Sequence, residues 1–200
     1  MEVEPVRKKK QVKKIYRWLK ENYTVREAEL WLIGCNVALR CGDLLSLRFD
    51  QIDGKTHIEI HEQKTSKHKK FPITPIVRES VERLREYYAS KEWFVTKKFE
   101  SVYLFQGTSH RNYHHLKPCT IQWVSEVFKK CQRELPLPFN FNTHSMRKTF
   151  GYRAYKNGED IHHLQALFNH SHSKVTLRYI GVTKREIEKM YFKNSMDIAS

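Results

Sequence analysis

The chain has 200 residues, enough for one domain with a sizeable core, and its 40% hydrophobic and 12% aromatic residues exclude a disordered chain. Lys and Arg number 37 against 22 Asp and Glu, and the net charge of +15 favours a polyanionic partner, nucleic acid above all. No apolar run reaches membrane-spanning length, and the four cysteines form no CxxC pair. We therefore expect a cytoplasmic protein with free thiols and no membrane partner.

The beginning of the chain predicts a basic segment followed by core helices. Residues 1–14 are polar and basic, which suits either a frayed terminus or an arm along a DNA backbone. A short helix is expected over 15–21. Thr24, with Glu27 three residues later, then predicts a capping box at the start of an apolar helix over 25–39.

Arg40 lies in the connection between that helix and the next. Asp43 is predicted to cap a short helix over 44–47, whose leucines reach the core. Arg40 is then fixed on both sides, and Asp43 can orient its guanidinium for ligand binding. Taken alone, the pattern favours the simpler alternative of a surface ion pair between Arg40 and Asp43.

A β-hairpin is predicted next. Residues 57–63 alternate, with Ile58 and Ile60 facing inward, and Phe71 with Ile73 marks the return strand. The lysine-rich tip, residues 64–70, suits a solvated turn as well as a phosphate contact. Pro75 then opens a helix that runs to about residue 89.

Residues 90–117 show the weakest pattern, with a short strand expected over 102–105. The loop that follows carries His110, His114 and His115, which raises the question of a zinc site. Adjacent histidines point apart in regular structure, and no cysteine or carboxylate stands at ligand spacing, so we expect no metal. Another helix is predicted from Thr120 to about 134, ended by a proline-rich run.

The stretch 142–181 carries the most chemistry. His144 and Arg147 are three residues apart, which places them on one face of a helix capped by Thr143. His170 ends the next apolar-periodic segment, and Tyr179 follows nine residues later. An arginine, two imidazoles and a phenol in a basic chain suit a phosphate ligand.

In this order, the motifs resemble the catalytic domain of the tyrosine recombinase (phage integrase) family. The resemblance implies a mainly helical α+β fold for residues 24–200, with a small antiparallel β-hairpin or sheet on one side, and leaves 1–23 as a basic segment. Asp43 stands at the family's supporting acidic position. The residues that match the family's catalytic set are Arg40, Lys64, His144, Arg147, His170 and Tyr179.

The chain departs from the family pattern in two places. Too few residues precede the match for the usual N-terminal helical domain, so we expect either an excised catalytic domain or a short recombinase resembling the fimbrial-switch invertases. In addition, Phe168-Asn169 stands before His170, where Leu-Gly is usual.

The resemblance also implies the reaction. Tyr179 attacks the scissile phosphodiester and forms a 3′-phosphotyrosyl bond, without metal, ATP or other cofactor, while His144 acts as general base or positioning group. Arg40, Arg147 and His170 bind the non-bridging oxygens. Lys64 protonates the departing 5′-oxygen, although a slipped hairpin could present another lysine.

The implied partner is double-stranded DNA, with four protomers joining two duplexes and a free protein that can be monomeric. Helix 184–193 is expected to dock on a neighbouring protomer or to pack on its own core. The alternatives are topoisomerase IB-like relaxation and a non-catalytic DNA-binding regulator on the same fold. The residues expected to contact DNA are Lys67, Lys69, Lys70, Lys148, Lys174 and Arg178.

Overall fold

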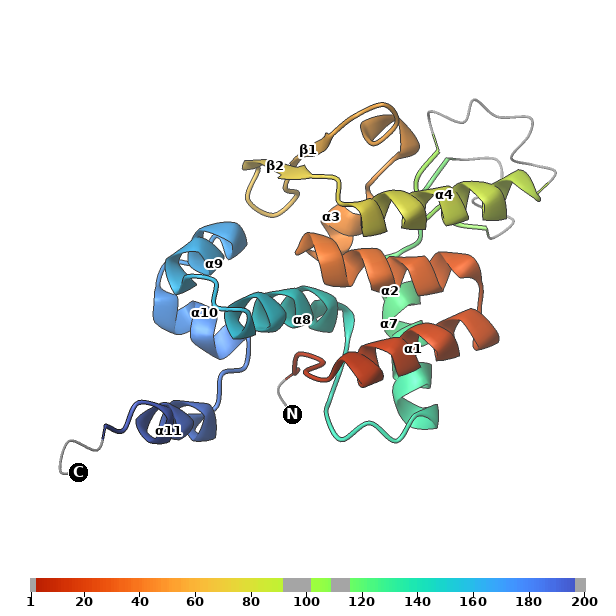
Figure 1. Cartoon of the computed structure of the whole chain (residues 1–200). Helices are drawn as coiled ribbons and strands as arrows, with labels where there is room; N and C mark the ends of the chain where they lie inside the picture. Colours follow the sequence, from red (N-terminus) through yellow and green to blue (C-terminus); the bar gives the residue numbers. More distant parts are fainter. Residues whose placement is uncertain (1–2, 92–101, 109–115, 197–200) are drawn as a thin grey trace.

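Two groups of helices meet along helix α8 in the computed structural model, which describes residues 3–91, 102–108 and 116–196 (Figure 1). The first group contains α1 (Lys9–Asn22), α2 (Val25–Val37), α4 (Pro75–Ala89) and α7 (Ile121–Glu134). The second contains α8 (Thr143–Lys156), α9 (Ile161–Phe168) and α10 (Ser173–Tyr179), and α11 (Lys184–Lys193) follows it. Between α2 and α4 lie α3 (Cys41–Leu45), the 3₁₀ helix η1 (Phe49–Gln51), β1 (His57–His61) and β2 (His68–Pro72).

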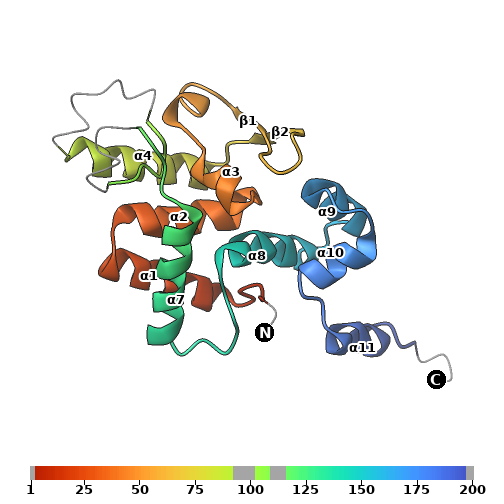
Figure 2. The ribbon, with the colours of Figure 1, turned by 180° about the vertical axis from the view of Figure 1, so that it is seen from behind.

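Helix α2 forms the centre of the main core, because apolar side chains surround it on nearly all sides. It packs against α1, α4 and α8, and both views of the ribbon show it enclosed by them (Figures 1 and 2). Its fully buried Trp31 makes edge contacts with Phe128 and Phe141, with ring centroids 5.7 Å apart in each pair. The predicted core helix and its Thr24 cap are confirmed: the hydroxyl accepts from the Arg26 amide at 3.2 Å.

The hairpin is antiparallel, and its register explains its two faces. Ile58 and Ile60 are buried while their neighbours in β1 are exposed, as the alternation predicted. The return strand begins earlier than expected, because the pairing continues to His61 opposite His68. Lys69 and Lys70 therefore belong to strand β2, and the tip is shorter than the predicted 64–70.

Two expectations for the first fifty residues are corrected. Of the two alternatives for residues 1–14, the frayed terminus does not fit the described part, because α1 begins at Lys9 and residues 3–7 bond to α8. Asp43 does not cap α3, since it lies inside the helix and its carboxylate accepts from the Gln63 amide at 2.8 Å. Arg40 occupies the N-cap position instead.

Two local predictions further along are also corrected. Helix α8 is capped by Asn142 rather than Thr143, since the Asn142 amide oxygen accepts from the His144 amide at 2.8 Å. Residues 102–105 form no strand and contribute to one isolated bridge, Tyr103 with Arg48; the next residue, Gln106, forms another with Pro118. The histidine loop considered for zinc lies outside the described residues.

A second, smaller core joins α8, α9 and α10 around the buried Phe168 and Ile180. It depends on Gly151 in α8, where an added Cβ would lie 2.5 Å from the Phe168 ring and 2.7 Å from Ile180. The small residue lets α9 and α10 approach α8 closely. This core carries Tyr179 at the end of α10.

None of the described helices is both long enough and apolar enough to cross a membrane. All four cysteines are free thiols, as expected; Cys41 is partly exposed and the others are buried.

Candidate active site

Arg147 is fixed in the protein interior by the ends of two other helices. It is 3% exposed, and its guanidinium donates to the carbonyl oxygens of Ala38, after α2, and Phe168, in α9, the latter at 3.1 Å. The guanidinium carbon also lies 4.8 Å above the Phe168 ring. Burial lowers the pKa of Arg147, and the nearby charge of Arg40 adds to this effect. A second positive group therefore faces Arg147.

Glu62 lies between the two arginines. Its carboxylate is 2.7 Å from Arg40 Nη1 and 4.0 Å from Arg147 Nη1, and the side chain is 4% exposed. Burial alone would raise the pKa of Glu62, but the hydrogen bond from Thr65 and the ion pair with Arg40 bring it below its ordinary value. Glu62 therefore orients Arg40, the task that the sequence had suggested for Asp43.

Tyr179 lies against His170 and Phe168. The ring centroids of Tyr179 and His170 are 5.0 Å apart in an edge arrangement, and Phe168 is 5.3 Å away. Burial raises the pKa of the phenol, while the charges of Arg147 and Arg40 and a hydrogen bond with Arg147 act in the opposite direction. The phenol thus stands beside both arginines.

Both histidines of the candidate site have a pKa below the ordinary value of 6.5. His170 follows Asn169, whose left-handed backbone (φ 55°, ψ 47°) explains why glycine is usual there and why asparagine is tolerated. Its Nδ1 lies 3.1 Å from the Thr176 hydroxyl. Burial, followed by neighbouring positive charges, lowers the pKa of His170; the same two causes lower the pKa of His144 in the first turn of α8, although that residue is exposed at the surface and the surrounding positive charges are the firmer cause there. Both imidazoles are therefore predominantly neutral at pH 7.

The lysines of the hairpin differ in their surroundings. Lys64 is exposed at the tip, and its charge acts on His144. Lys69 is half-buried with its Nζ 3.3 Å from the Leu167 carbonyl, and burial lowers its pKa to about 8. Lys67 donates to the Asn169 side chain at 2.6 Å, and Lys70 pairs with Glu59 at 2.7 Å. A groove of about 540 Å³ separates this hairpin from α9.

The predicted DNA-contacting residues outside the hairpin divide into two kinds. Lys174 and Arg178 are exposed on α10. Lys148 is 6% exposed, donates to the Val3 carbonyl at 2.7 Å and lies 5.0 Å from the Tyr179 ring centroid. Lys148 thus lies inside the protein, and we do not place it among the residues that contact DNA.

The structure thus gathers five of the six predicted catalytic residues, with Lys64 at the edge. The gathered residues, from α8 and three connecting or terminal segments, are Arg40, His144, Arg147, His170 and Tyr179.

Sequence reasoning missed two residues that support this group. Phe168 is fully buried and contacts Arg147, His170 and Tyr179 at once. Glu62 continues the inward positions 58 and 60 of the predicted strand, and an inward acid in a basic chain signals a buried cation partner. No comparable signal in the sequence identified Phe168 as a support of the site, since its contacts with Arg147 and Tyr179 depend on how α8 and α10 pack against α9.

The pattern of the phage integrase family matches residues 6–186. The chain belongs to this family. It is 29% identical over 189 residues to the probable integrase/recombinase YoeC of Bacillus subtilis (strain 168), covering 94% of this chain and 95% of that protein. It is also 23% identical over 150 residues to the tyrosine recombinase XerD of Halalkalibacterium halodurans, covering 72% of this chain and 48% of that protein.

Solved structures show the same fold. The XerA recombinase superposes with a TM-score of 0.71 and 16% identity, covering 98% of this chain and 65% of that one. A lambda integrase dimer bound to a COC′ core site gives a TM-score of 0.64 and 14% identity over 99% of this chain and 52% of that one. The chain thus spans about half the length of lambda integrase and of the XerD and XerC relatives. The resemblance to the tyrosine recombinase family and the mainly helical α+β fold are confirmed.

Proposed function

We propose that this protein is a site-specific DNA recombinase or integrase that cleaves and rejoins DNA through a 3′-phosphotyrosyl bond at Tyr179. The observation that carries the proposal is the position of the Tyr179 ring, in contact with His170 and beside Arg147 and Arg40. The names of the relatives, integrase/recombinase and tyrosine recombinase, support the same reaction.

The two arginines would bind the non-bridging oxygens of the scissile phosphate. Glu62 neutralises one positive charge of the pair, so the site retains an excess charge that a phosphate complements. Burial raises the pKa of the Tyr179 phenol, and the positive charges of Arg147 and Arg40 act in the opposite direction, which would favour loss of its proton during in-line attack.

The proton transfers balance without a co-reactant. The Tyr179 oxygen bonds to phosphorus as the bond from phosphorus to the 5′-oxygen breaks, and His144 takes the phenol proton. Lys64 gives a proton to the departing 5′-oxygen. Attack by a 5′-hydroxyl on the phosphotyrosine reverses every step, so rejoining needs neither metal nor ATP.

The surface suits a DNA duplex and a neighbouring protomer. We assign DNA-backbone contacts to exposed basic residues around the site, among them Lys67, Lys70, Lys174 and Arg178. Helix α11 leaves Ile187, Tyr191 and Phe192 exposed by 47%, 77% and 83%. This apolar face supports docking on another protomer in a synaptic tetramer rather than packing on its own core.

A nicked suicide substrate tests the proposal. After cleavage, the short fragment that carries the free 5′-hydroxyl diffuses away, so it cannot attack the phosphotyrosine and the covalent intermediate is trapped. The probe is a library of nicked duplexes with randomised central sequence, enriched through repeated covalent capture. The wild-type protein should yield a denaturant-resistant DNA adduct that disappears in Tyr179→Phe and persists in the matched control Tyr155→Phe. An equal adduct yield in Tyr179→Phe contradicts the proposal.

Captured sequences then separate the related functions. Strand exchange between two duplexes that carry the site indicates recombination. Relaxation of a supercoiled plasmid without exchange indicates topoisomerase-like activity, and tight binding without any adduct indicates a regulator.

A further inference from the structure

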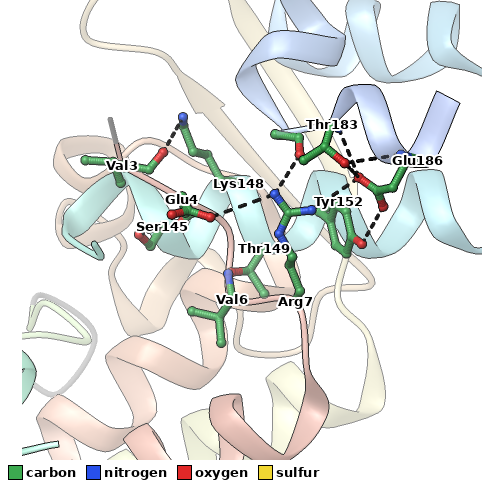
Figure 3. A network of polar contacts seen from close by, with 11 residues as sticks. Val3, Glu4, Val6, Arg7, Ser145, Lys148, Thr149, Tyr152, Thr183 and Glu186 are labelled. Atoms are coloured by element: carbon green, nitrogen blue, oxygen red, sulfur yellow. Dashed lines mark hydrogen bonds and ion pairs between the residues drawn. The ribbon is translucent and has the colours of Figure 1, made fainter. Parts of the chain in front are cut away.

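Residues 3–7, which we call the N-terminal strap, run along one face of α8 (Figure 3). The Ser145 hydroxyl donates to the Glu4 carbonyl, and the Val6 amide donates to the Thr149 hydroxyl, both at 2.8 Å. The Arg7 guanidinium carbon lies 4.9 Å from the ring centroid of Tyr152. Positions 145, 149 and 152 form one helical face, so the whole strap is aligned on α8.

From this face, Arg7 reaches the junction between α10 and α11. Its Nη2 donates to the Gly181 carbonyl at 2.8 Å and its Nη1 to the Glu186 carboxylate at 3.2 Å (Figure 3). Gly181 has a left-handed backbone (φ 75°), and an added Cβ would lie 3.0 Å from Pro5. The strap and the turn after Tyr179 are thus packed tightly together.

Glu186 is a fixed anion in this junction. It also accepts from the Tyr152 hydroxyl at 2.8 Å and the Thr183 amide at 3.0 Å. Burial would raise its pKa, but these hydrogen bonds and the charge of Arg7 lower the value to about 2. The Glu186 carboxylate therefore stays ionised well below neutral pH, and its ion pair with Arg7 persists at any pH well above about 2.

The strap also reaches the ring of Tyr179 through Lys148. This lysine donates to the Val3 carbonyl at 2.7 Å, and its Nζ lies 5.0 Å from the Tyr179 ring centroid. The strap therefore acts on the tyrosine from two directions, at its ring and at the turn two residues further on.

We propose that the N-terminal strap positions Tyr179 for attack, and that Arg7 is the positioning residue that transmits this effect. The inference rests on the proposed role of Tyr179 as nucleophile. Helix α10 has only 7 residues, too few to hold itself rigid, and α11 beyond it exposes its apolar side chains. The bonds to Gly181 and Glu186 add to the support that the buried Ile180 gives the C-terminal end of α10.

The test compares Arg7→Ala and Arg7→Lys with the matched control Arg153→Ala. Arg153 is also an arginine bound to a carbonyl, that of Cys35 at 3.0 Å, but its hydrogen bonds, to Cys35 and Asn36, tie it to α2 rather than to the strap or α10. At saturating DNA, the single-turnover cleavage rate of Arg7→Ala should fall about 10–100-fold, as expected for a misplaced nucleophile. DNA affinity should stay within about twofold, since Arg7 is given no DNA contact. Arg7→Lys should recover part of the loss, and Arg153→Ala should match the wild type.

Hydrogen exchange of the DNA-free proteins provides the readout that does not depend on catalysis. In Arg7→Ala, amides over 177–187 should exchange faster while those of α2 and α4 keep their protection. Unchanged exchange over 177–187, an equal increase in α2 and α4, or an unchanged cleavage rate each overturns the inference. If the wild type forms no adduct, the proposed function fails, and the exchange data still decide whether the strap holds the junction.

Discussion

The arginine pocket and the lysine hairpin face the same site but are held in different ways. Arg147 is 3% exposed and bonded to two helix-end carbonyls, and Arg40 is paired with the buried Glu62. Lys64 is exposed at the tip of a two-stranded hairpin, an element that is marginally stable by itself. Under the proposed mechanism, the phosphate-binding arginines are therefore organised before DNA arrives, whereas the proton donor Lys64 would be placed by the DNA complex.

Replacing Arg147 by Lys gives the largest expected effect. Lysine keeps the charge but cannot fork between oxygens, so the single-turnover cleavage rate should fall by about 10³–10⁵. The measurement is quenched-flow cleavage of the nicked substrate, with circular dichroism and the melting temperature as controls for folding. A loss below about tenfold would show that the pocket is not the main source of charge stabilisation.

Lys64→Ala should reduce cleavage by about 10²–10⁴, the usual contribution of a general acid. A substrate with sulfur in place of the bridging 5′-oxygen needs no proton, because a thiolate is a much better leaving group than an alkoxide. This substrate should restore Lys64→Ala and leave Arg147→Lys impaired. If the sulfur substrate restored cleavage by Lys69→Ala but not by Lys64→Ala, the general acid would be Lys69, the half-buried lysine of β2.

Glu62→Gln tests whether the arginines depend on their shared carboxylate. Loss of a charged partner costs about 1–3 kcal/mol. If this whole free-energy cost is expressed as misplacement of Arg40 in the transition state, the cleavage rate falls by roughly 5–150-fold. Glu59→Gln is the matched control, since Glu59 is an exposed acid of the same hairpin. Equal cleavage by both variants would remove Glu62 from the site.

The pH dependence gives the smallest effect. Burial and nearby positive charges lower the pKa of His144 below its ordinary 6.5, so the neutral base persists below neutrality. At subsaturating DNA, the cleavage rate reports the protonation state of the free protein. The contribution of His144 to this rate should be constant from pH 8 to 7 and should fall only below pH 6.5. His144→Gln should abolish this acid limb, and a midpoint above 6.5 assigned to His144 would contradict the burial argument.

Periodicity and caps predicted most helices, because each of these features is local. The helix from Pro75 to Ala89 and the inward isoleucines of β1 followed directly from residue spacing. The start of α1 at Lys9 did not, because exposed lysines form helix as readily as coil once Ile15, Trp18 and Leu19 are packed.

The residues of the candidate site could be proposed from the sequence, but their supports could not. The family motif identified Arg40, His144 and Tyr179, while their geometry depends on contacts between distant segments. Glu62 replaced Asp43 as the partner of Arg40 because the hairpin folds back over the α2–α3 connection; its inward position in the strand signals a buried cation partner, but not which cation. The strap across α8 was invisible for the same reason, since its partners lie more than 140 residues away.

Peptide mapping of the trapped adduct by mass spectrometry tests the central claim most directly. After digestion with nuclease and protease, the peptide that contains Tyr179 should carry a nucleotide linked through its 3′-phosphate. A nucleotide on any other residue, or one linked through a 5′-phosphate, would contradict the proposed reaction.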